Sequence, residues 1–168
     1  AVLLIDAVDG VTEQDAHIGG HVHDAWRGAI IAVNKWDLVA KDTHTADDFA
    51  ASVRAQLKFL EYAPIVFISA VTGQRAGRVL TMADDVQAQR TKRVPTAELN
   101  KLLAELEARH DLRRKGRPVR IRYITQVGVA PPRFALFVND RELVHFSYER
   151  FVANLIRERY GFQGTPLQ

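Results

Sequence analysis

Hydrophobic and polar residues are arranged in alternating blocks along the first half of the chain. Three short apolar runs, rich in β-branched residues, have the pattern of buried strands: 2–5, 29–33 and 65–68. Three longer segments are predicted to be helices, the middle one with apolar residues at spacings of three and four: 12–26, 45–60 and 78–91. This order of strands and helices predicts a parallel sheet with helices on its faces. Ligands bind such sheets at the carboxyl ends of the strands.

The order of the elements changes after residues 90–95, a charged segment that contains Pro95. We predict a linker there, between a first domain at residues 1–93 and a second domain at residues 96–168. The second domain is expected to contain a helix, two strands and a helix: 96–110, 119–127, 134–139 and 147–160. Residues 120–124 alternate charged and apolar side chains, as expected of an antiparallel sheet with one face in water.

The second predicted strand leads directly into the sequence Asn34-Lys35-Trp36-Asp37. An ionised Asp37 can accept two parallel hydrogen bonds from N1–H and the 2-amino group of guanine, a pair that adenine lacks. Asn34 would connect the base and the phosphate loop by hydrogen bonds, and the methylene stem of Lys35 can lie along one face of the purine. The pattern Asn-Lys-x-Asp is the guanine-recognition motif of GTPases.

A second loop supports the same interpretation. The third predicted strand ends in Ser69-Ala70, which matches the loop in which a backbone N–H of GTPases meets guanine O6. The sequence contains no Gly-x-x-x-x-Gly-Lys-Ser/Thr run for binding phosphates. The segment from Asp6 to Gly10 has the wrong spacing for the Asp-x-x-Gly motif on the magnesium side. We therefore expect a fragment that begins within a GTPase domain, and no catalytic residue is assigned.

Composition is that of a globular protein, with 47% hydrophobic and 26% charged residues. No apolar run approaches the roughly 20 residues of a membrane-spanning helix. The absence of cysteine excludes disulfides, and a cytoplasmic location is expected. Residues 1–95 carry 10 basic and 12 acidic side chains, whereas residues 96–168 carry 13 and 8, a net charge of +5. This excess suggests an RNA partner, with a solvated basic surface as the alternative.

Three further features have functional interpretations of their own. His17 and His21 have the spacing of metal ligands, but no carboxylate or cysteine completes the set, and no metal site is assigned. Residues 161–164 match the Gly-x-x-Gly loop of RNA-binding KH domains, although we interpret the glycine as a helix cap. A basic run is our candidate for contact with RNA phosphates, with a solvated loop as the alternative: Arg113, Arg114, Lys115, Arg117, Arg120 and Arg122.

Seven short segments, in their order and spacing, resemble the C-terminal part of the Der (EngA) family of bacterial GTPases. They are residues 34–37, 68–70, 123–126, 131–134, 137–139, 146–148 and 161–166. Members of that family have two tandem G domains and a KH-like C-terminal domain. The resemblance covers nearly the whole chain. It implies an α/β fold in which an incomplete P-loop-type G domain with a parallel sheet is followed by a KH-like α+β domain.

The resemblance also implies a function in assembly of the large ribosomal subunit, with that subunit and ribosomal RNA as partners. The intact protein would hydrolyse GTP with magnesium, and the missing G-domain portions would be partners in cis. Tight binding of GTP or GDP by this fragment alone is not expected. Five residues would hold the guanine: Asn34, Lys35, Asp37, Ser69 and Ala70. The alternative is a non-enzymatic KH-like module that binds RNA or protein beside an inactive G-domain remnant.

Overall fold

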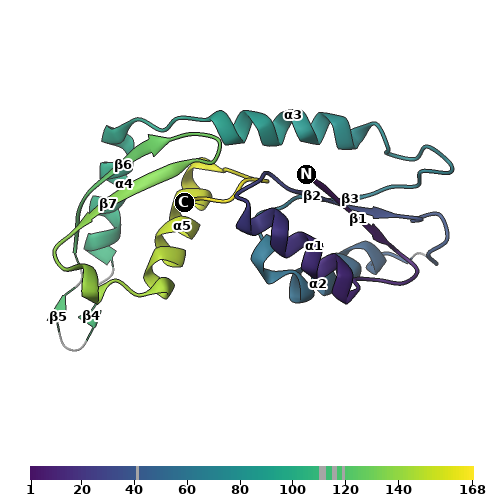
Figure 1. The fold of residues 1–168 in the computed structure, drawn as a ribbon, viewed down its shortest axis with the longest axis horizontal. Helices are drawn as coiled ribbons and strands as arrows, with labels where there is room; N and C mark the ends of the chain where they lie inside the picture. The colour runs from purple at the N-terminus through teal and green to yellow at the C-terminus, as the bar shows by residue number, and fades with distance from the viewer. Residues whose placement is uncertain (41, 110–112, 115–116, 119) are drawn as a thin grey trace. The chain divides into compact units, whose positions relative to one another are not determined.

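The computed structural model describes residues 1–40, 42–109, 113–114, 117–118 and 120–168 (Figure 1). Contacts divide the chain into two compact units. Unit 1 consists of Ala1–Arg90 and Phe162–Pro166, and unit 2 consists of Thr91–Gly161 and Leu167–Gln168. A short segment that follows the last helix of unit 2 therefore belongs to unit 1. The domain boundary expected at residues 93–96 stays a prediction.

Unit 1 is built on a parallel sheet. Its strands are β1 (Val2–Asp6), β2 (Ile30–Asn34) and β3 (Ile65–Phe67), in the order β1-β2-β3. Its helices are α1 (Glu13–Asp24), α2 (Thr45–Gln56), α3 (Arg78–Thr91) and the short 3-10 helix η1 (Lys58–Leu60). The predicted parallel α/β arrangement is confirmed. The register places Asp6 beside Asn34, so both residues lie at the carboxyl edge of the sheet.

Alternate residues of β2 point to opposite faces of the sheet and pack into two apolar clusters. The cluster on the side of α1 and α2 includes Ile31, Val33, Val53, Leu57 and Leu60. The cluster on the side of α3 includes Ile30, Ala32, Val66, Ile68 and Val86. Helices therefore cover both faces of the sheet (Figure 1). This explains why β2 is a continuous apolar run instead of an alternating one.

The second helix is shorter than the sequence predicts. Its apolar spacing predicts a helix to residue 60, but α2 ends at Gln56 and η1 follows. Leu57, between the two, is fully buried and has φ −110° and ψ 50°. The guanidinium of Arg54 donates to the carbonyl oxygens of Leu60 and Ala63. These bonds stabilise the tighter turn where another turn of α-helix was expected.

Unit 2 combines helices with an antiparallel hairpin. Its elements are α4 (Thr96–Arg109), β4 (Arg113–Arg114), β5 (Arg117–Pro118), β6 (Ile121–Gly128), β7 (Arg133–Val138), η2 (Arg141–Leu143) and α5 (Phe146–Tyr160). β6 and β7 are antiparallel, as the alternating pattern predicted. A separate short hairpin, β4 with β5, precedes β6, in a stretch between residues 110 and 119 for which the sequence predicted no element. Side chains of α4, β6 and α5 meet in an apolar core: Leu99, Ile121, Ile124, Val152 and Ile156.

Asn100 of α4 covers the edge of β6 and limits how that edge can be used. Its Nδ2 donates to the Ile124 carbonyl at 2.9 Å, and its Oδ1 accepts from the Ile124 N–H at 3.2 Å. The side-chain amide thus takes the place of a neighbouring strand at this residue. An incoming peptide cannot pair with Ile124 without breaking both bonds.

The glycine loop after α5 has a structural function. Gly161, with φ +87°, caps α5 as predicted, and its N–H donates to the Arg157 carbonyl at 2.8 Å. Gly164 is buried and has φ +76°, and a Cβ at this position would lie 2.2 Å from Val86 Cγ2. Its N–H also donates to the Tyr62 carbonyl at 2.7 Å. Packed in this way within unit 1, Gly164 is not presented to nucleic acid.

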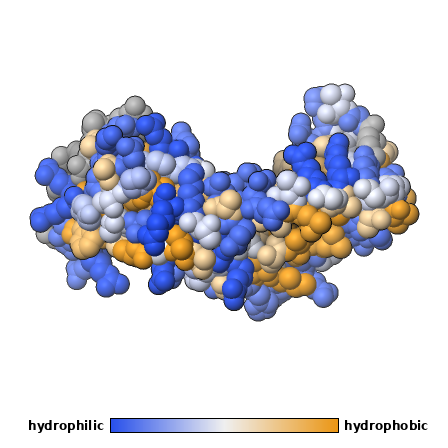
Figure 2. All heavy atoms as spheres, turned by 90° about the horizontal axis from the view of Figure 1, so that it is seen from above, coloured by the Kyte–Doolittle hydropathy of each residue, from blue (hydrophilic) through white to orange (hydrophobic). Residues whose placement is uncertain are grey.

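On the face shown in Figure 2, hydrophilic side chains alternate with areas of exposed apolar side chains. The most exposed large apolar residues include Val8, Leu38, Val71, Leu80 and Phe146. None of the helices in the described parts of the chain has the length and apolarity needed to span a membrane.

Candidate functional site

The first base loop, residues 34–37, is anchored by its third residue. Asn34 is the last residue of β2, and Lys35 has a left-handed φ of +60°, so the chain turns sharply. Trp36 is 4% exposed and packs on Phe67, with ring centroids 4.2 Å apart. Its N–H donates to the Ile68 carbonyl at 3.0 Å. Because Trp36 is held in the core, Lys35 and Asp37 on either side of it are exposed.

The second base loop, residues 69–74, follows β3 and is stabilised by its own turn. Ser69 is fully buried, and its N–H donates to the Gln74 carbonyl at 3.0 Å. Its Oγ accepts the N–H of Thr72 at 3.1 Å. The buried hydroxyl therefore closes the loop, while the next residue, Ala70, is exposed.

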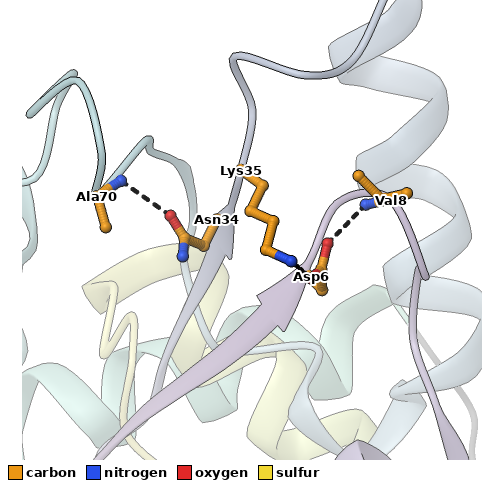
Figure 3. A network of polar contacts seen from close by, with 5 residues as sticks. All are labelled: Asp6, Val8, Asn34, Lys35 and Ala70. Atoms are coloured by element: carbon orange, nitrogen blue, oxygen red, sulfur yellow. Dashed lines mark hydrogen bonds and ion pairs between the residues drawn. The ribbon is translucent and has the colours of Figure 1, made fainter.

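One hydrogen bond joins the two base loops. The Ala70 N–H donates to Asn34 Oδ1 at 2.9 Å, across the ends of β2 and β3 (Figure 3). The register of the sheet brings these strand ends together, since Val33 pairs with Phe67. The two segments that the sequence marks as guanine-recognition loops are thus neighbours in the fold.

A third strand end contributes an ion pair. Lys35 Nζ lies 2.6 Å from Asp6 Oδ2, and the Val8 N–H donates to Asp6 Oδ1 at 2.9 Å (Figure 3). The hydrogen bond from Lys35 is the main reason that the pKa of Asp6 lies below its ordinary value, and the same bond raises the pKa of Lys35. Asp6 thereby fixes the end of the Lys35 side chain.

Asp37 differs from Asp6 in having no partner. Its side chain is exposed, and among the residues that the structure describes none forms a hydrogen bond or ion pair with it. A free carboxylate at the carboxyl edge of the sheet has both oxygens available to accept hydrogen bonds from a ligand. This arrangement suits a ligand with two adjacent N–H donors.

The positions of Asp6 and Trp36 in this site are not predicted by the sequence patterns above. Those patterns place Asp6 only in a magnesium motif with the wrong spacing, and they give Trp36 no function. The end of β1 is the available signal for Asp6, because parallel strands place their carboxyl ends at one edge. Trp36 is recognisable as the apolar residue that separates two polar ones.

The candidate RNA-binding residues are spread over β4, β5 and β6 of unit 2. One of them, Arg120, directly precedes β6. Arg113 and Arg114 form β4, Arg117 lies in β5, and Lys115 lies outside the described residues. Arg120 and Arg122 are exposed, and they line a cavity of about 560 Å³ between α4 and β6. Asn100 and Asn139 contribute polar groups to the same cavity.

The described residues do not gather metal ligands. No group of three or more His, Cys, Asp or Glu side chains suitable for a metal ion occurs among them. His17 and His21 are both exposed on α1. At the base loops, the Asp6 carboxylate is already paired with Lys35. The base-loop residues therefore fit recognition of a purine better than binding of magnesium.

Comparisons with known proteins were made for the whole chain. Residues 93–168 match a family described as the KH-domain-like C-terminal domain of EngA bacterial GTPase enzymes. The chain is 51% identical to the GTPase Der of Chloroflexus aggregans, 46% to that of Alkaliphilus oremlandii and 47% to that of Desulfitobacterium hafniense. Each match covers 99% of this chain and 38% of the relative, so the chain spans well under half of their length.

The chain also aligns with solved structures. A crystal structure of an Aquifex aeolicus Era variant bound to GDP and aluminium fluoride aligns with 99% of this chain and 62% of its own. The identity is 16% and the TM-score is 0.42, so no argument rests on this match.

Proposed function

The chain is a relative of the Der (EngA) GTPases along 99% of its length, and we propose that unit 1 is the guanine-recognition part of a GTP-binding site. The resemblance expected from the sequence is confirmed, and the chain is a member of a GTPase family. One observation carries the proposal. The bond between Ala70 N–H and Asn34 Oδ1 joins the two base loops beside the unpaired carboxylate of Asp37.

Asp37 selects guanine in this proposal. Its carboxylate accepts one hydrogen bond from N1–H and one from the 2-amino group, a charge-assisted bidentate pair. Adenine offers no such pair and would leave the carboxylate desolvated and unpaired, which costs about 1–3 kcal/mol or more for a charged group. The exposed position of Asp37 beside the buried Trp36 leaves room for the base.

Lys35 and Ala70 complete the contacts with the base. The methylene stem of Lys35 lies along the purine face while Asp6 holds its ammonium. Ser69 is fully buried whereas Ala70 is exposed, so the N–H of Ala70 is the better placed donor to guanine O6. Its N–H donates to Asn34 in this structure, and the base would share or replace that acceptor.

The remaining functions belong to the longer protein that we propose contains this chain. That protein would bind GTP or GDP with magnesium and hydrolyse GTP, using phosphate-binding and catalytic groups from G-domain portions that this sequence lacks. It would act in the cytoplasm in assembly of the large ribosomal subunit, with ribosomal RNA as a partner. The similarity to Der and the basic charge of residues 96–168 support this proposal.

Nucleoside titrations of the isolated chain test the guanine site. Guanosine should shift the amide resonances of residues 34–37 and 69–70, whereas adenosine at equal concentration should not. Asp37→Asn should weaken the response to guanosine and produce one to xanthosine, because an amide can donate to the 2-oxo group. Asp47→Asn, an exposed acidic residue of α2, is the control and should leave the guanosine response unchanged.

Two results would contradict this assignment. One is an equal response of the same amides to adenosine and guanosine. The other is an Asp37→Asn variant that keeps its guanosine response and gains none to xanthosine.

A second candidate function, a non-enzymatic RNA-binding module, is supported by the charge of unit 2. The 13 basic and 8 acidic residues of the segment 96–168 give it the excess that phosphate contacts require. Replacing Arg113 and Arg114 with Glu should lower RNA affinity and reduce the salt dependence by roughly one unit of slope per lost contact. Lys58→Glu combined with Arg78→Glu, two exposed residues of unit 1, is the control with the same change of charge. Equal losses in both variants would mean that net charge alone decides binding.

A further inference from the structure

An exposed aromatic pair lies on the outer face of the β6–β7 hairpin. Tyr123 of β6 and Phe137 of β7 are partners in the register, and their ring centroids lie 5.6 Å apart at an interplanar angle of 60°. Their exposed fractions are 44% and 55%. Ile121 and Ile124 of the same strand are buried in the core. The sheet thus presents two large rings to solvent on the face opposite its core.

The charge of this hairpin has one sign. The only charged residues of β6 and β7 are Arg122 and Arg133, both exposed, and every residue of the two strands is described. Arg120, directly before β6, is also exposed. The nearest acidic residue in sequence is Asp140, whose carboxylate accepts the N–H of Glu142. A ligand on this face therefore meets aromatic rings among cationic groups.

A cavity lies between α4 and β6, at the edge of the hairpin. Its volume is about 560 Å³, within the usual range of roughly 300–1,000 Å³ for ligand pockets. Arg120 and Arg122 line it, and no residue in the described parts of the chain forms an ion pair with either guanidinium. Arg122 is adjacent to Tyr123, and Arg120 is three residues away, about 10 Å along a strand. These arginines and the two tilted rings are thus close enough along the strand to contact one ligand.

We propose that Tyr123 and Phe137 form a stacking surface for the bases of single-stranded RNA, with Arg120 and Arg122 as its phosphate contacts. Unpaired bases stack on exposed aromatic side chains, and arginines beside the rings neutralise the backbone. The proposal refines the RNA-binding part of the proposed function and does not depend on the guanine site.

The surroundings of the rings favour RNA over a protein partner. A protein interface normally has a core depleted of charge, and here Arg122 lies directly beside Tyr123 while Arg133 is the charged residue of the partner strand. No acidic side chain of the two strands opposes a phosphate backbone. A duplex is disfavoured because its bases are stacked on each other and unavailable. A single strand can present its bases to the aromatic rings and its phosphates to the arginines.

The experiment measures binding of fluorescein-labelled RNA to the whole 168-residue chain at several salt concentrations. The probes are a single strand of about 12 nucleotides, within the range that one aromatic-lined site can cover, and the same strand annealed to its complement.

The main variant combines Tyr123→Leu with Phe137→Leu, which keeps apolar volume but removes the aromatic faces. Phe146→Leu, an exposed aromatic residue on α5, is the matched control. Phe137→Tyr retains a ring and should behave like the natural chain. Thermal melts verify folding, which exposed side chains should not affect.

The double Leu variant should bind the single strand at least about tenfold more weakly, since stacking contributes roughly 1–3 kcal/mol per base. Its salt dependence should be unchanged, whereas Arg122→Gln should reduce the salt slope by about 0.7. The control and the Tyr variant should bind normally. A 2-aminopurine base in the strand should be quenched by the natural chain and much less by the double variant.

Three outcomes would overturn the inference in distinguishable ways. Normal affinity of a folded double Leu variant would exclude stacking and leave RNA binding by charge intact. Failure of the natural chain to bind either RNA at low salt would refute the RNA-binding function itself. Unchanged RNA binding together with a loss of self-association in the double variant would identify the rings as a protein interface. In each case the guanosine response of residues 34–37 is measured separately and reports on the guanine site alone.

Discussion

The Ala70 N–H donates to the side-chain oxygen of Asn34 at 2.9 Å, and this bond connects loops that are 36 residues apart in sequence. It makes the first and second base loops a single surface at the carboxyl edge of β2 and β3. Asn34 thereby positions both the second base loop, which carries Ala70, and the first base loop, to which Asn34 itself belongs. A change at Asn34 should affect both stability and ligand binding.

Asn34→Ala should lower the free energy of unfolding by about 0.5–1.5 kcal/mol, the net contribution of one hydrogen bond. It should also broaden or shift the amide resonance of Ala70, because that N–H loses its acceptor. Chemical denaturation and an amide spectrum measure the two effects. Gln56→Ala removes an exposed side-chain bond to Ser52 on α2 and serves as the control. An Ala70 resonance unaffected by Asn34→Ala would contradict the link.

The ion pair between Asp6 and Lys35 should make stability depend on pH in the acid range. The pKa of Asp6 is lowered in the folded chain, so the pair contributes stability above the unfolded value of about 3.9. This contribution is lost as the pH falls through the lower, folded pKa. Melting temperatures below about pH 4 should therefore fall less steeply in Asp6→Asn than in the natural chain.

Lys35→Gln provides an independent check of the same pair. The carboxyl carbon resonance of Asp6 should then titrate closer to the ordinary pKa. The return should be partial, because the Val8 N–H still donates to Asp6. An Asp6 titration that does not respond to the loss of Lys35 would mean that the pair is not formed in solution.

Gly164→Ala should strongly destabilise the chain. The left-handed φ of +76° costs an alanine about 1–2 kcal/mol. The new Cβ, 2.2 Å from Val86 Cγ2, adds an overpacking cost of about 1–3 kcal/mol. Gly73→Ala separates the two effects, since Gly73 has φ +75° and no atom lies within 4 Å of the position that its Cβ would take. Gly73→Ala should therefore show only the cost of the left-handed φ when its free energy of unfolding is measured by chemical denaturation.

The contact with Val86 can be tested by a double change. Combining Gly164→Ala with Val86→Ala removes the clashing methyl groups, so the double variant should be less destabilised than the sum of the single variants. Strictly additive losses, or equal losses at Gly73 and Gly164, would show that packing against α3 does not constrain this loop.

The isolated chain should release no measurable phosphate from GTP. Base contacts leave the triphosphate charge uncompensated, and the sequence holds no phosphate-binding loop to supply N–H donors and a lysine. A sensitive assay of phosphate release, with and without magnesium, measures this. Steady release that is abolished by Asp37→Ala would show instead that the chain can assemble a catalytic site by itself.

The sequence alone determined the parallel α/β class of unit 1 and the antiparallel hairpin of unit 2. These are consequences of local periodicity, because buried strands are continuous apolar runs and half-buried strands alternate. The sequence also marked the two base loops, since Asn34 to Asp37 and Ser69-Ala70 directly follow apolar strands. Gly161 as a helix cap was recognisable for the same reason, as a glycine after an amphipathic segment.

Only the tertiary structure decided which of these groups meet. The pairing of Lys35 with Asp6 and of Asn34 with Ala70 depends on the register of three strands, and no local pattern encodes register between distant segments. The early end of α2 at Gln56 depends on bonds from Arg54 to carbonyl groups beyond the helix. Gly164 belongs to unit 1 because it packs against Val86 and donates to the Tyr62 carbonyl, both far earlier in the chain. Periodicity reports which face of an element is buried, whereas the fold alone sets what that face touches.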